Sequence, residues 1–223
     1  MNITEAIKTR KSTRAFLDKP VTEEQIRQVL DIARWAPSGG NLQPWRVHVV
    51  MGPGRDRLIE TVKKAIADNP LADESELAVY PPKLPPPWRD RRYEVGEAMY
   101  DLLGIPREDK PARIAHLMRN YEFFGAPAGL FFSVDRQFDK GQWAHLGMLM
   151  QSIALAALDK GLATCMQEAW AVRAKTVSAF LGLEENEQLY CGMALGYADP
   201  AAKVNALRSS RISTDEFATF ISH

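Results

Sequence analysis

Apolar and polar residues along the chain follow two different periods, and these predict helices that alternate with short strands. The clearest helix face has apolar residues at i, i+3, i+4 and i+7, namely Ile26, Val29, Leu30 and Ala33. Thr22 and Gln25 form a capping-box pair at its start, and Pro37 is expected to stop it. Residues 45–51 instead alternate apolar and polar side chains, which is the pattern of a half-buried strand.

The same patterns predict further elements along the whole chain. Helices are expected over residues 2–9, 22–36, 58–66, 91–103, 111–123, 139–161 and 172–181, with a last one starting after residue 213. Strands are expected over residues 45–51, 128–134, 162–166 and 189–196. The result is an α+β fold in which seven or eight helices surround a small sheet of about four strands.

Residues 142–160 stand out because they form an almost entirely apolar helix. A helix that is apolar all round has to be covered on every side. One small sheet cannot supply that cover, so the pattern favours a homodimer with a helical interface. His145 and Gln151 interrupt the apolar run, which is also short for a membrane span, so a buried helix is expected.

Composition narrows the classes of function. The 28 basic and 28 acidic residues give a net charge of zero, which argues against a general nucleic-acid binder. Two cysteines cannot build a disulfide framework or a cysteine-rich zinc site. The first residues lack the apolar core of a secretory signal, so a cytoplasmic protein with reduced thiols is expected. A length of 223 residues suits one ordinary domain or a compact pair.

The familiar catalytic motifs do not occur in this sequence. The segment GPGRDR at 52–57 lacks the third glycine of a dinucleotide-binding fingerprint, and there is neither a P-loop nor a Gly-x-Ser-x-Gly elbow. Four histidines do not have the spacing of metal ligands and are interpreted as structural: His48, His116, His145 and His223. No metal site is expected, and an enzyme of this kind would depend on a cofactor.

Three polar clusters are candidates for contact with a ligand. Residues 10–14, RKSTR, combine three cations with two hydroxyls, which suits a phosphate and a polar ring edge. Residues 36–45, APSGGNLQPW, offer glycines for close backbone approach and amide groups for a polar ring. Arg208 and Arg211 could add phosphate contacts. Taken singly, each has an ordinary alternative: a helix C-terminus, a helix-to-strand turn and a solvated charge patch.

Taken together and in order, these segments resemble the FMN-dependent nitroreductase family. The pattern R-K-S-x-R-x-F, followed by P-V and a capped helix ending in A-P-S-G-x-N-x-Q-P-W, is similar to the family's first half. The segment GLAT at 161–164, followed by Gln167 and Glu168, and the strand CGMALGY at 191–197 are similar to its second half. The resemblance runs from about residue 3 to 217, so a single FMN-binding domain over residues 1–223 is expected.

The resemblance implies a nitroreductase-like homodimer, with a mixed or antiparallel sheet of about four to five strands and two FMN molecules in the interface. It implies flavin contacts from one chain by Arg10, Lys11, Ser12, Arg14, Gln167, Glu168, Arg208 and Arg211. It implies a loop offered to the ring by the partner subunit, made of Pro37, Ser38, Gly39 and Asn41. The residues at 10–14 would hold the phosphate and the pyrimidine edge, those at 167–168 would pass near N5, and the last two arginines would clamp the phosphate.

The activity implied by the resemblance is hydride transfer from NADH or NADPH to flavin N5, followed by two-electron reduction of a small aromatic acceptor such as a nitroaromatic or a quinone, with ping-pong kinetics. The flavin carries this chemistry, so no catalytic side chain is assigned. Three alternatives stay open. The first is another enzyme of the same fold, either a flavin-dependent reductive dehalogenase or one that fragments or oxidises a special substrate. The others are an FMN-binding protein without turnover and a helical interaction protein with no cofactor.

Residues 69–110 are the most individual part of the chain, with prolines at 70, 81, 82, 85, 86 and 87. A long irregular segment inside a compact domain is either functional or disordered. One hypothesis is that Trp88 and Tyr93 form an aromatic lid over a flat substrate, while the nearby arginines favour a carboxylated aromatic. The alternative is an ordinary proline-rich surface loop with a solvated run of charges.

Overall fold

A single antiparallel sheet organises the chain. The computed structural model describes residues 2–70 and 75–222. Within them the strands are β1 (Trp45–Met51), β2 (Ala128–Asp135), β3 (Ala163–Gln167) and β4 (Glu187–Gly196). Their order is β1-β2-β4-β3, and every neighbouring pair is antiparallel. The four predicted strands are therefore confirmed, and the sheet is antiparallel rather than mixed.

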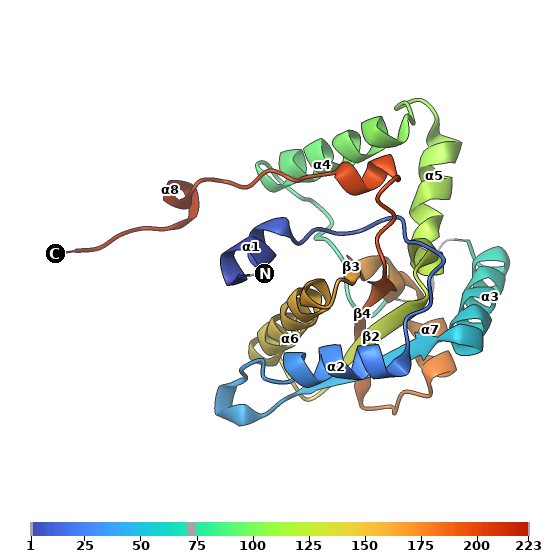
Figure 1. The fold of residues 1–223 in the computed structure, drawn as a ribbon, viewed down its shortest axis with the longest axis horizontal. Helices are drawn as coiled ribbons and strands as arrows, with labels where there is room; N and C mark the ends of the chain where they lie inside the picture. The colour runs from blue at the N-terminus through green and yellow to red at the C-terminus, as the bar shows by residue number, and fades with distance from the viewer. Residues whose placement is uncertain (1, 71–74, 223) are drawn as a thin grey trace.

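Helices lie on both faces of this sheet (Figure 1). The α-helices are α1 (Ile3–Thr9), α2 (Glu23–Ala33), α3 (Gly52–Asp68), α4 (Trp88–Leu103), α5 (Lys110–Met118), α6 (Lys140–Asp159), α7 (Ala174–Leu181) and α8 (Thr214–Phe217). Four short 3-10 helices join them, which are η1 (Gly39–Asn41), η2 (Arg119–Gly125), η3 (Glu168–Arg173) and η4 (Lys203–Ala206). After η4 the chain passes α4 and leaves the body of the molecule, with α8 in the projecting segment (Figure 1).

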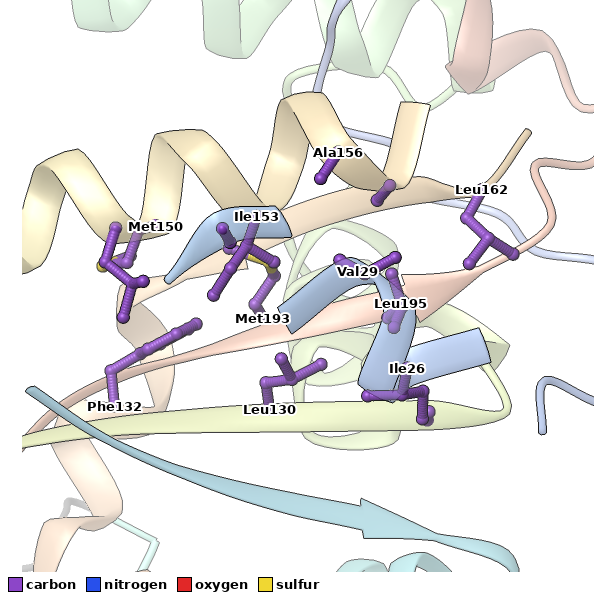
Figure 2. Close-up of a cluster of buried hydrophobic side chains, with 14 of the residues drawn as sticks. Ile26, Val29, Leu130, Phe132, Met150, Ile153, Ala156, Leu162, Met193 and Leu195 are labelled. Carbon is purple, nitrogen blue, oxygen red and sulfur yellow. The ribbon is translucent and has the colours of Figure 1, made fainter. Parts of the chain in front are cut away.

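The two faces of the sheet form two separate hydrophobic cores. Alternate residues of β2 point to opposite sides, so Leu130 and Phe132 pack against α2 and α6 while Phe131 packs on the other face. Figure 2 shows the first core, in which Ile26 and Val29 of α2 meet Ile153 of α6 above the strands. The second core holds α3, α7, η2 and η3 against the sheet. Residues in both cores are almost fully removed from water, and this burial is the main stabilising term.

A bulge in β4 breaks the regular alternation close to the end of β3. The register passes from Phe132 opposite Cys191 to Ser133 opposite Leu189, so Tyr190 has no partner on β2. An extra residue in one strand re-aims the side chains around it. Leu189 and Cys191 accordingly pack in different cores although they are two positions apart.

Close packing of aromatic rings on a glycine fixes the segment that follows β3. The ring of Trp170 lies 4.7 Å from that of Phe123 and 5.1 Å from that of Phe131, measured between centroids. A Cβ atom on Gly192 would lie 2.4 Å from Trp170 Cδ1, so only glycine allows the indole to sit against β4. Trp170 thereby anchors η3, whose first residue is Glu168.

Most of the predicted helices are confirmed with small changes at their ends. The capping boxes of Thr22 and Asp139 are present, and Gly182 ends α7 in the left-handed conformation that favours glycine. The helix predicted over 111–123 is wrong in its second half, because α5 ends at Met118 and η2 follows. Two residues of η2, Phe123 and Phe124, have positive φ and cannot continue an α-helix.

One side of the long apolar helix α6 stays open to solvent in the single chain. Its buried residues face the sheet and α2, whereas Ala144, Gly147 and Met148 are exposed, Met148 by 45%. The sheet therefore covers only part of the helix, as its composition predicts. Among the described residues, no helix combines the length and the hydropathy that a bilayer crossing would require.

Candidate functional site

A cavity lined by cations lies between the first helix and the C-terminal segment. Its volume is about 390 Å³, and its lining includes Arg10, Lys11, Ser12, Arg14, Arg208 and Arg211. We call it the cationic cavity. The structure thus brings together six of the residues that sequence reasoning assigns to the flavin, from opposite ends of the chain.

Backbone hydrogen bonds hold both segments of the cationic cavity in place. The N–H of Thr13 donates to the carbonyl of Thr164 at 2.9 Å, which ties the first segment to β3. Asn205, which is buried, accepts from the N–H of Arg14 at 2.8 Å through Oδ1 and donates to the carbonyl of Ala15 at 2.8 Å. The ammonium of Lys11 donates to the backbone carbonyl of Asn205. Sequence reasoning missed Asn205, since a lone asparagine carries no signal of its partners.

The cations of this cavity repel one another. Burial lowers the pKa of Arg10, and the neighbouring Arg211 and Arg208 lower it further. Burial and the charge of Arg208 likewise lower the pKa of Lys11. Among the described residues, none of the cations that line the cavity forms an ion pair with a carboxylate. A group of unpaired cations of this kind is stabilised by an anion, and a phosphate matches the geometry of guanidinium groups.

The two C-terminal arginines are positioned by short-range bonds that leave donors available. The Nη1 group of Arg208 donates to the carbonyl of Thr9 at 2.8 Å. Arg211 donates from Nη1 to Ser209 Oγ and to the carbonyl of Ser210, both at 2.7 Å. Each guanidinium has five N–H donors, so several remain for an anion in the cavity.

A second cavity, of about 620 Å³, lies at the end of β3. Most of its lining is apolar, including Val79, Leu117, Met118, Met150, Met166 and Val172, so we call it the apolar cavity. Gln167, Glu168 and Tyr190 add polar groups. Tyr190 donates to Glu168 Oε1 at 3.3 Å, and burial together with this carboxylate raises the pKa of Tyr190 to about 12. The phenol therefore stays protonated across the physiological range.

The side chain of Gln167 is held by hydrogen bonds within the fold. Its amide nitrogen donates to the carbonyl of Asn120 at 2.8 Å, and its oxygen accepts from Trp170 Nε1 at 3.3 Å. With the side chain buried and bonded on both ends, Gln167 can offer only its backbone to the cavity. The flavin contact at Gln167 and Glu168 stays a prediction, in which Gln167 would contribute its backbone.

A third cavity, the central cavity of about 800 Å³, connects the other two. It shares Val95, Ser209 and Arg211 with the cationic cavity. It shares Tyr80 and Arg92 with the apolar cavity. The three cavities therefore adjoin one another and are together called the depression, with cations at one end and mostly apolar side chains at the other.

The proposed lid residues lie on α4 rather than in a loop, and the structure separates them. Trp88 opens α4 and lines the central cavity. Tyr93, five positions later, lines none of these three cavities. The guanidinium carbon of Arg107 lies over its ring, 5.4 Å from the ring centroid of Tyr93. Tyr80 takes the place expected for Tyr93, because it lines both the central and the apolar cavity.

The loop at residues 37–41 is away from these cavities in the single chain. Pro37, Ser38, Gly39 and Asn41 line none of the three. The N–H of Gly39 donates to His145 Nε2 at 3.2 Å, which attaches the loop to the N-terminal half of α6. Asn41 has a positive φ, as does the glycine before it, so the exposed loop turns sharply.

Comparison with known proteins assigns the chain to a family. The family model described as Nitroreductase family matches residues 7–197, and the chain belongs to this family. A 4-nitrobenzoate reductase from Pseudomonas putida is 38% identical over 96% of this chain and 93% of its own length. A nitrobenzene nitroreductase from Ectopseudomonas oleovorans is 34% identical over 98% of this chain and 96% of its own. The resemblance that the motifs indicate is thereby confirmed.

Solved structures agree with this assignment. The FMN and NADPH-dependent nitroreductase NfnB from Sphigopyxis sp. strain HMH superposes with a TM-score of 0.97 at 41% identity, covering 100% of both chains. The FMN-dependent nitroreductase NfnB from Mycobacterium smegmatis, solved in complex with NADPH, gives a TM-score of 0.92 at 32% identity, covering 98% of this chain and 97% of its own. The nitroreductase-like fold predicted from the sequence is confirmed.

Proposed function

We propose that this protein is an FMN-dependent oxidoreductase that uses NADPH or NADH to reduce small aromatic acceptors such as nitroaromatics or quinones. The observation that carries the proposal is the cationic cavity, where Arg10, Arg208 and Arg211 stand together without carboxylate partners in a chain of the Nitroreductase family. The chemistry that FMN supplies when bound is the acceptance of a hydride and the delivery of two electrons to an acceptor.

The residues present fit this cofactor. The cationic cavity matches the charge of a phosphate, and the apolar cavity matches the faces of an isoalloxazine ring. Arg10, Lys11, Arg208 and Arg211 would hold the phosphate. Ser12, whose backbone pairs with Thr164 of β3, and Arg14 line the same cavity and would contact the polar edge of the ring.

The side chains of the site bind and orient rather than react. A cation such as Arg14 beside the pyrimidine edge would stabilise negative charge on the ring. The apolar lining would exclude water from the acceptor side of the cavity. Tyr190 keeps its proton, as its raised pKa indicates, so it would act as a hydrogen-bonding group and not as a base.

The proposal includes a homodimer in which each chain completes the other's site. Two observations support it. The first is that Met148, an apolar residue of α6, is exposed by 45%. The second is a separate groove along α6, which is lined by the apolar residues Ile32, Trp35 and Pro37 and by Leu155 of α6 itself. The loop at 37–41 lines none of the three cavities of its own chain, but a partner subunit would bring it to the flavin ring. Both the apolar surface and the loop would thereby be accounted for.

Two further points belong to the proposal. We propose a cytoplasmic location, which agrees with two free, buried cysteine thiols and with a reductant made in that compartment. We also propose that residues 69–110, of which 71–74 lie outside the described residues, form the variable part of one domain over 1–223, with Trp88 as a lid residue over the central cavity. The exposure of Trp88, at 57%, and its position in the cavity lining support this role.

The test is the visible absorbance spectrum of the purified protein before and after anaerobic NADPH, and then NADH. A flavin band that bleaches supports the proposed activity, and an acceptor screen with nitroaromatics, quinones and halogenated phenols then separates reductase from dehalogenase. A flavin band that persists with both reductants favours an FMN-binding protein without turnover. A protein that stays colourless after incubation with FMN contradicts the proposal.

A matched pair of variants tests the site itself. Arg10→Gln removes a charge-assisted contact to the phosphate, so the dissociation constant for FMN should rise about 10- to 100-fold, measured by flavin fluorescence. Arg27→Gln removes the same charge from α2, where Arg27 pairs with Glu23 at the surface, and should leave FMN affinity unchanged. Equal affinities for the two variants would exclude Arg10 from the binding site.

A further inference from the structure

The junction of the central and apolar cavities contains one arginine whose role the cofactor does not explain. Arg92, on the second turn of α4, lines both cavities. It does not line the cationic cavity, where the phosphate would be held. Its guanidinium is therefore at the acceptor end of the depression rather than at the phosphate end.

The two other arginines around the central cavity, Arg91 and Arg211, do not line the apolar cavity. Arg211 is bonded to Ser209 and belongs to the cationic cavity. Arg91 lies near Glu216, whose pKa is lowered by hydrogen bonds from Ser213 and then by the charge of Arg91. Among the described residues, Arg92 forms no ion pair with a carboxylate. It is thus the cation at this junction that has charge to offer to a ligand.

An aromatic ring holds Arg92 in position. The guanidinium carbon lies 4.1 Å from the centroid of the Tyr80 ring, which is within the range of a cation–π contact. Tyr80 lines the same two cavities as Arg92. A guanidinium stacked on a ring keeps its N–H groups in the plane and directed outward, where they suit a carboxylate with two oxygen acceptors.

Among the described residues, the nearby carboxylates form no ion pair with Arg92. Glu168 lines the apolar cavity and accepts a hydrogen bond from the hydroxyl of Tyr190. Glu94 lines the central cavity and accepts a hydrogen bond from Ser210 Oγ at 3.4 Å. Arg92 is therefore the cation that an anionic group could contact at the junction, while an uncharged ring fits the methionine- and leucine-lined wall beyond it.

We propose that Arg92, stacked on Tyr80, binds the carboxylate of an aromatic nitro acid and so selects nitrobenzoate-type acceptors over neutral nitroaromatics. This inference rests on the proposed function and specifies its substrate class. Relatives named for a carboxylated acceptor, 4-nitrobenzoate, and for a neutral one, nitrobenzene, are similarly distant from this chain, so their names do not decide the class. The guanidinium of Arg92, which has no carboxylate partner among the described residues, favours an acceptor that carries a carboxylate.

The test compares 4-nitrobenzoate with its neutral methyl ester as acceptors of the FMN-loaded enzyme. The wild type should have the higher kcat/KM with 4-nitrobenzoate. In Arg92→Gln the ratio of the two kcat/KM values should fall about tenfold, the lower end for a charge-assisted contact because Arg92 is exposed. Arg92→Lys keeps the charge without the planar stacking and should give an intermediate ratio.

The matched control is Arg89→Gln on the same helix. Arg89 pairs with Asp90 at 2.7 Å and lines none of the three cavities, so the acceptor ratio should keep its wild-type value. The phosphates of the reductant are a second kind of anionic group that Arg92 could bind. A parallel measurement of kcat/KM for NADPH and NADH tests this alternative. If Arg92→Gln alters the preference for NADPH but not the acceptor ratio, the residue contacts the reductant's phosphate and the proposal is wrong.

Binding of 4-nitrobenzoate, measured by calorimetry, separates this proposal from the proposed function. Suppose that the wild type reduces neither acceptor, but that Arg92→Gln binds 4-nitrobenzoate about tenfold more weakly than the wild type does. The carboxylate site is then supported and the proposed reductase activity is not. If the wild type reduces both acceptors with equal kcat/KM and the variant does not change the ratio, the activity stands and the carboxylate site is overturned.

Discussion

His116 is a buried titratable residue next to the site, and the sequence alone indicates only that it is structural. Its ring lies between Tyr100 and Phe124, with centroid distances of 6.2 Å and 5.9 Å. Its Nε2 atom is buried without a hydrogen-bond partner. Burial lowers the pKa of His116 below its ordinary value of 6.5, and the charges of Arg119 and Arg14 lower it further.

This lowered pKa makes stability depend on pH. Below pH 6.5 the unfolded chain binds a proton at His116 that the folded chain does not bind, so the free energy of unfolding falls as the pH decreases toward the folded pKa. His116→Phe keeps an aromatic ring and removes the titration. Urea unfolding between about pH 5 and pH 7 should therefore show a smaller loss of stability for the variant than for the wild type. Equal losses would mean that other groups cause the acid sensitivity.

Single residues differ in how far the sequence reveals them. Arg10 and Arg211 belong to short motifs, so their type and order were sufficient to assign them to one site. Asn205 and Tyr80 have no motif, and only their contacts in three dimensions identify them. Gln167 was assigned by its place in a motif, but whether its side chain faces a ligand or the core depends on Asn120 and Trp170.

Helix ends were the most predictable local structures, because a cap depends only on residues within one turn. In α2 the N–H of Gln25 donates to Thr22 Oγ1 at 3.2 Å, and the side chain of Gln25 accepts from the N–H of Thr22 at 2.9 Å. The same capping box occurs at Ser213 and Glu216 of α8. The two helices differ in what they bury, since α2 packs Ile26 into the core and α8 buries no residue.

This difference predicts different costs for the same lost cap. Thr22→Ala should lower the free energy of unfolding by about 1 kcal/mol, because α2 has to be helical to fill the first core. Ser213→Ala is the matched control and should change it by less than about 0.3 kcal/mol, because unfolding of α8 does not expose core residues. Chemical denaturation of both variants is the measurement. An equal cost at both caps would show that α8 is packed in solution.

The segment after α5 shows where local patterns fail. Apolar residues continue at helical spacing through residue 123, but the chain there has to bring Phe123 against Trp170 and over Gly129 of β2. A Cβ atom on Gly129 would lie 2.2 Å from Phe123 Cε1. The tight turn of η2 satisfies this packing, and the burial of the aromatic rings outweighs the cost of positive φ at Phe123 and Phe124.

At the scale of the whole molecule, the exposed side of α6 is the feature that favours association of two chains. An apolar helix that is open to water on one side favours association, since burying Met148 and its neighbours removes apolar surface from solvent. The proposed homodimer would also explain the exposed Phe217 and Phe220 of the projecting C-terminal segment. Figure 1 shows that this segment lies clear of the sheet and of α6.

Met148→Glu tests the interface directly. A charge at this position has to be desolvated in a helical interface, so light scattering should show a shift from dimer to monomer. The variant should also bind FMN more weakly, because the loop at 37–41 of the partner is lost. Ile114→Glu on α5 is the control, since Ile114 is exposed by 59% outside the proposed interface. A wild type that is itself monomeric would contradict the proposed dimer.

The helix caps, the four strands and the family could be predicted before the fold was known, because each depends on neighbouring residues or on short motifs in order. The assembly of the site could not, because it depends on contacts between residues far apart in the chain. The cations of residues 10–14 and of residues 208–211 meet because Asn205 and β3 hold the two ends of the chain together. Likewise, Tyr93 lines none of the three cavities, because packing and not local pattern sets the rotation of α4 about its axis. Tyr80, from the segment before α4, lines two of them instead.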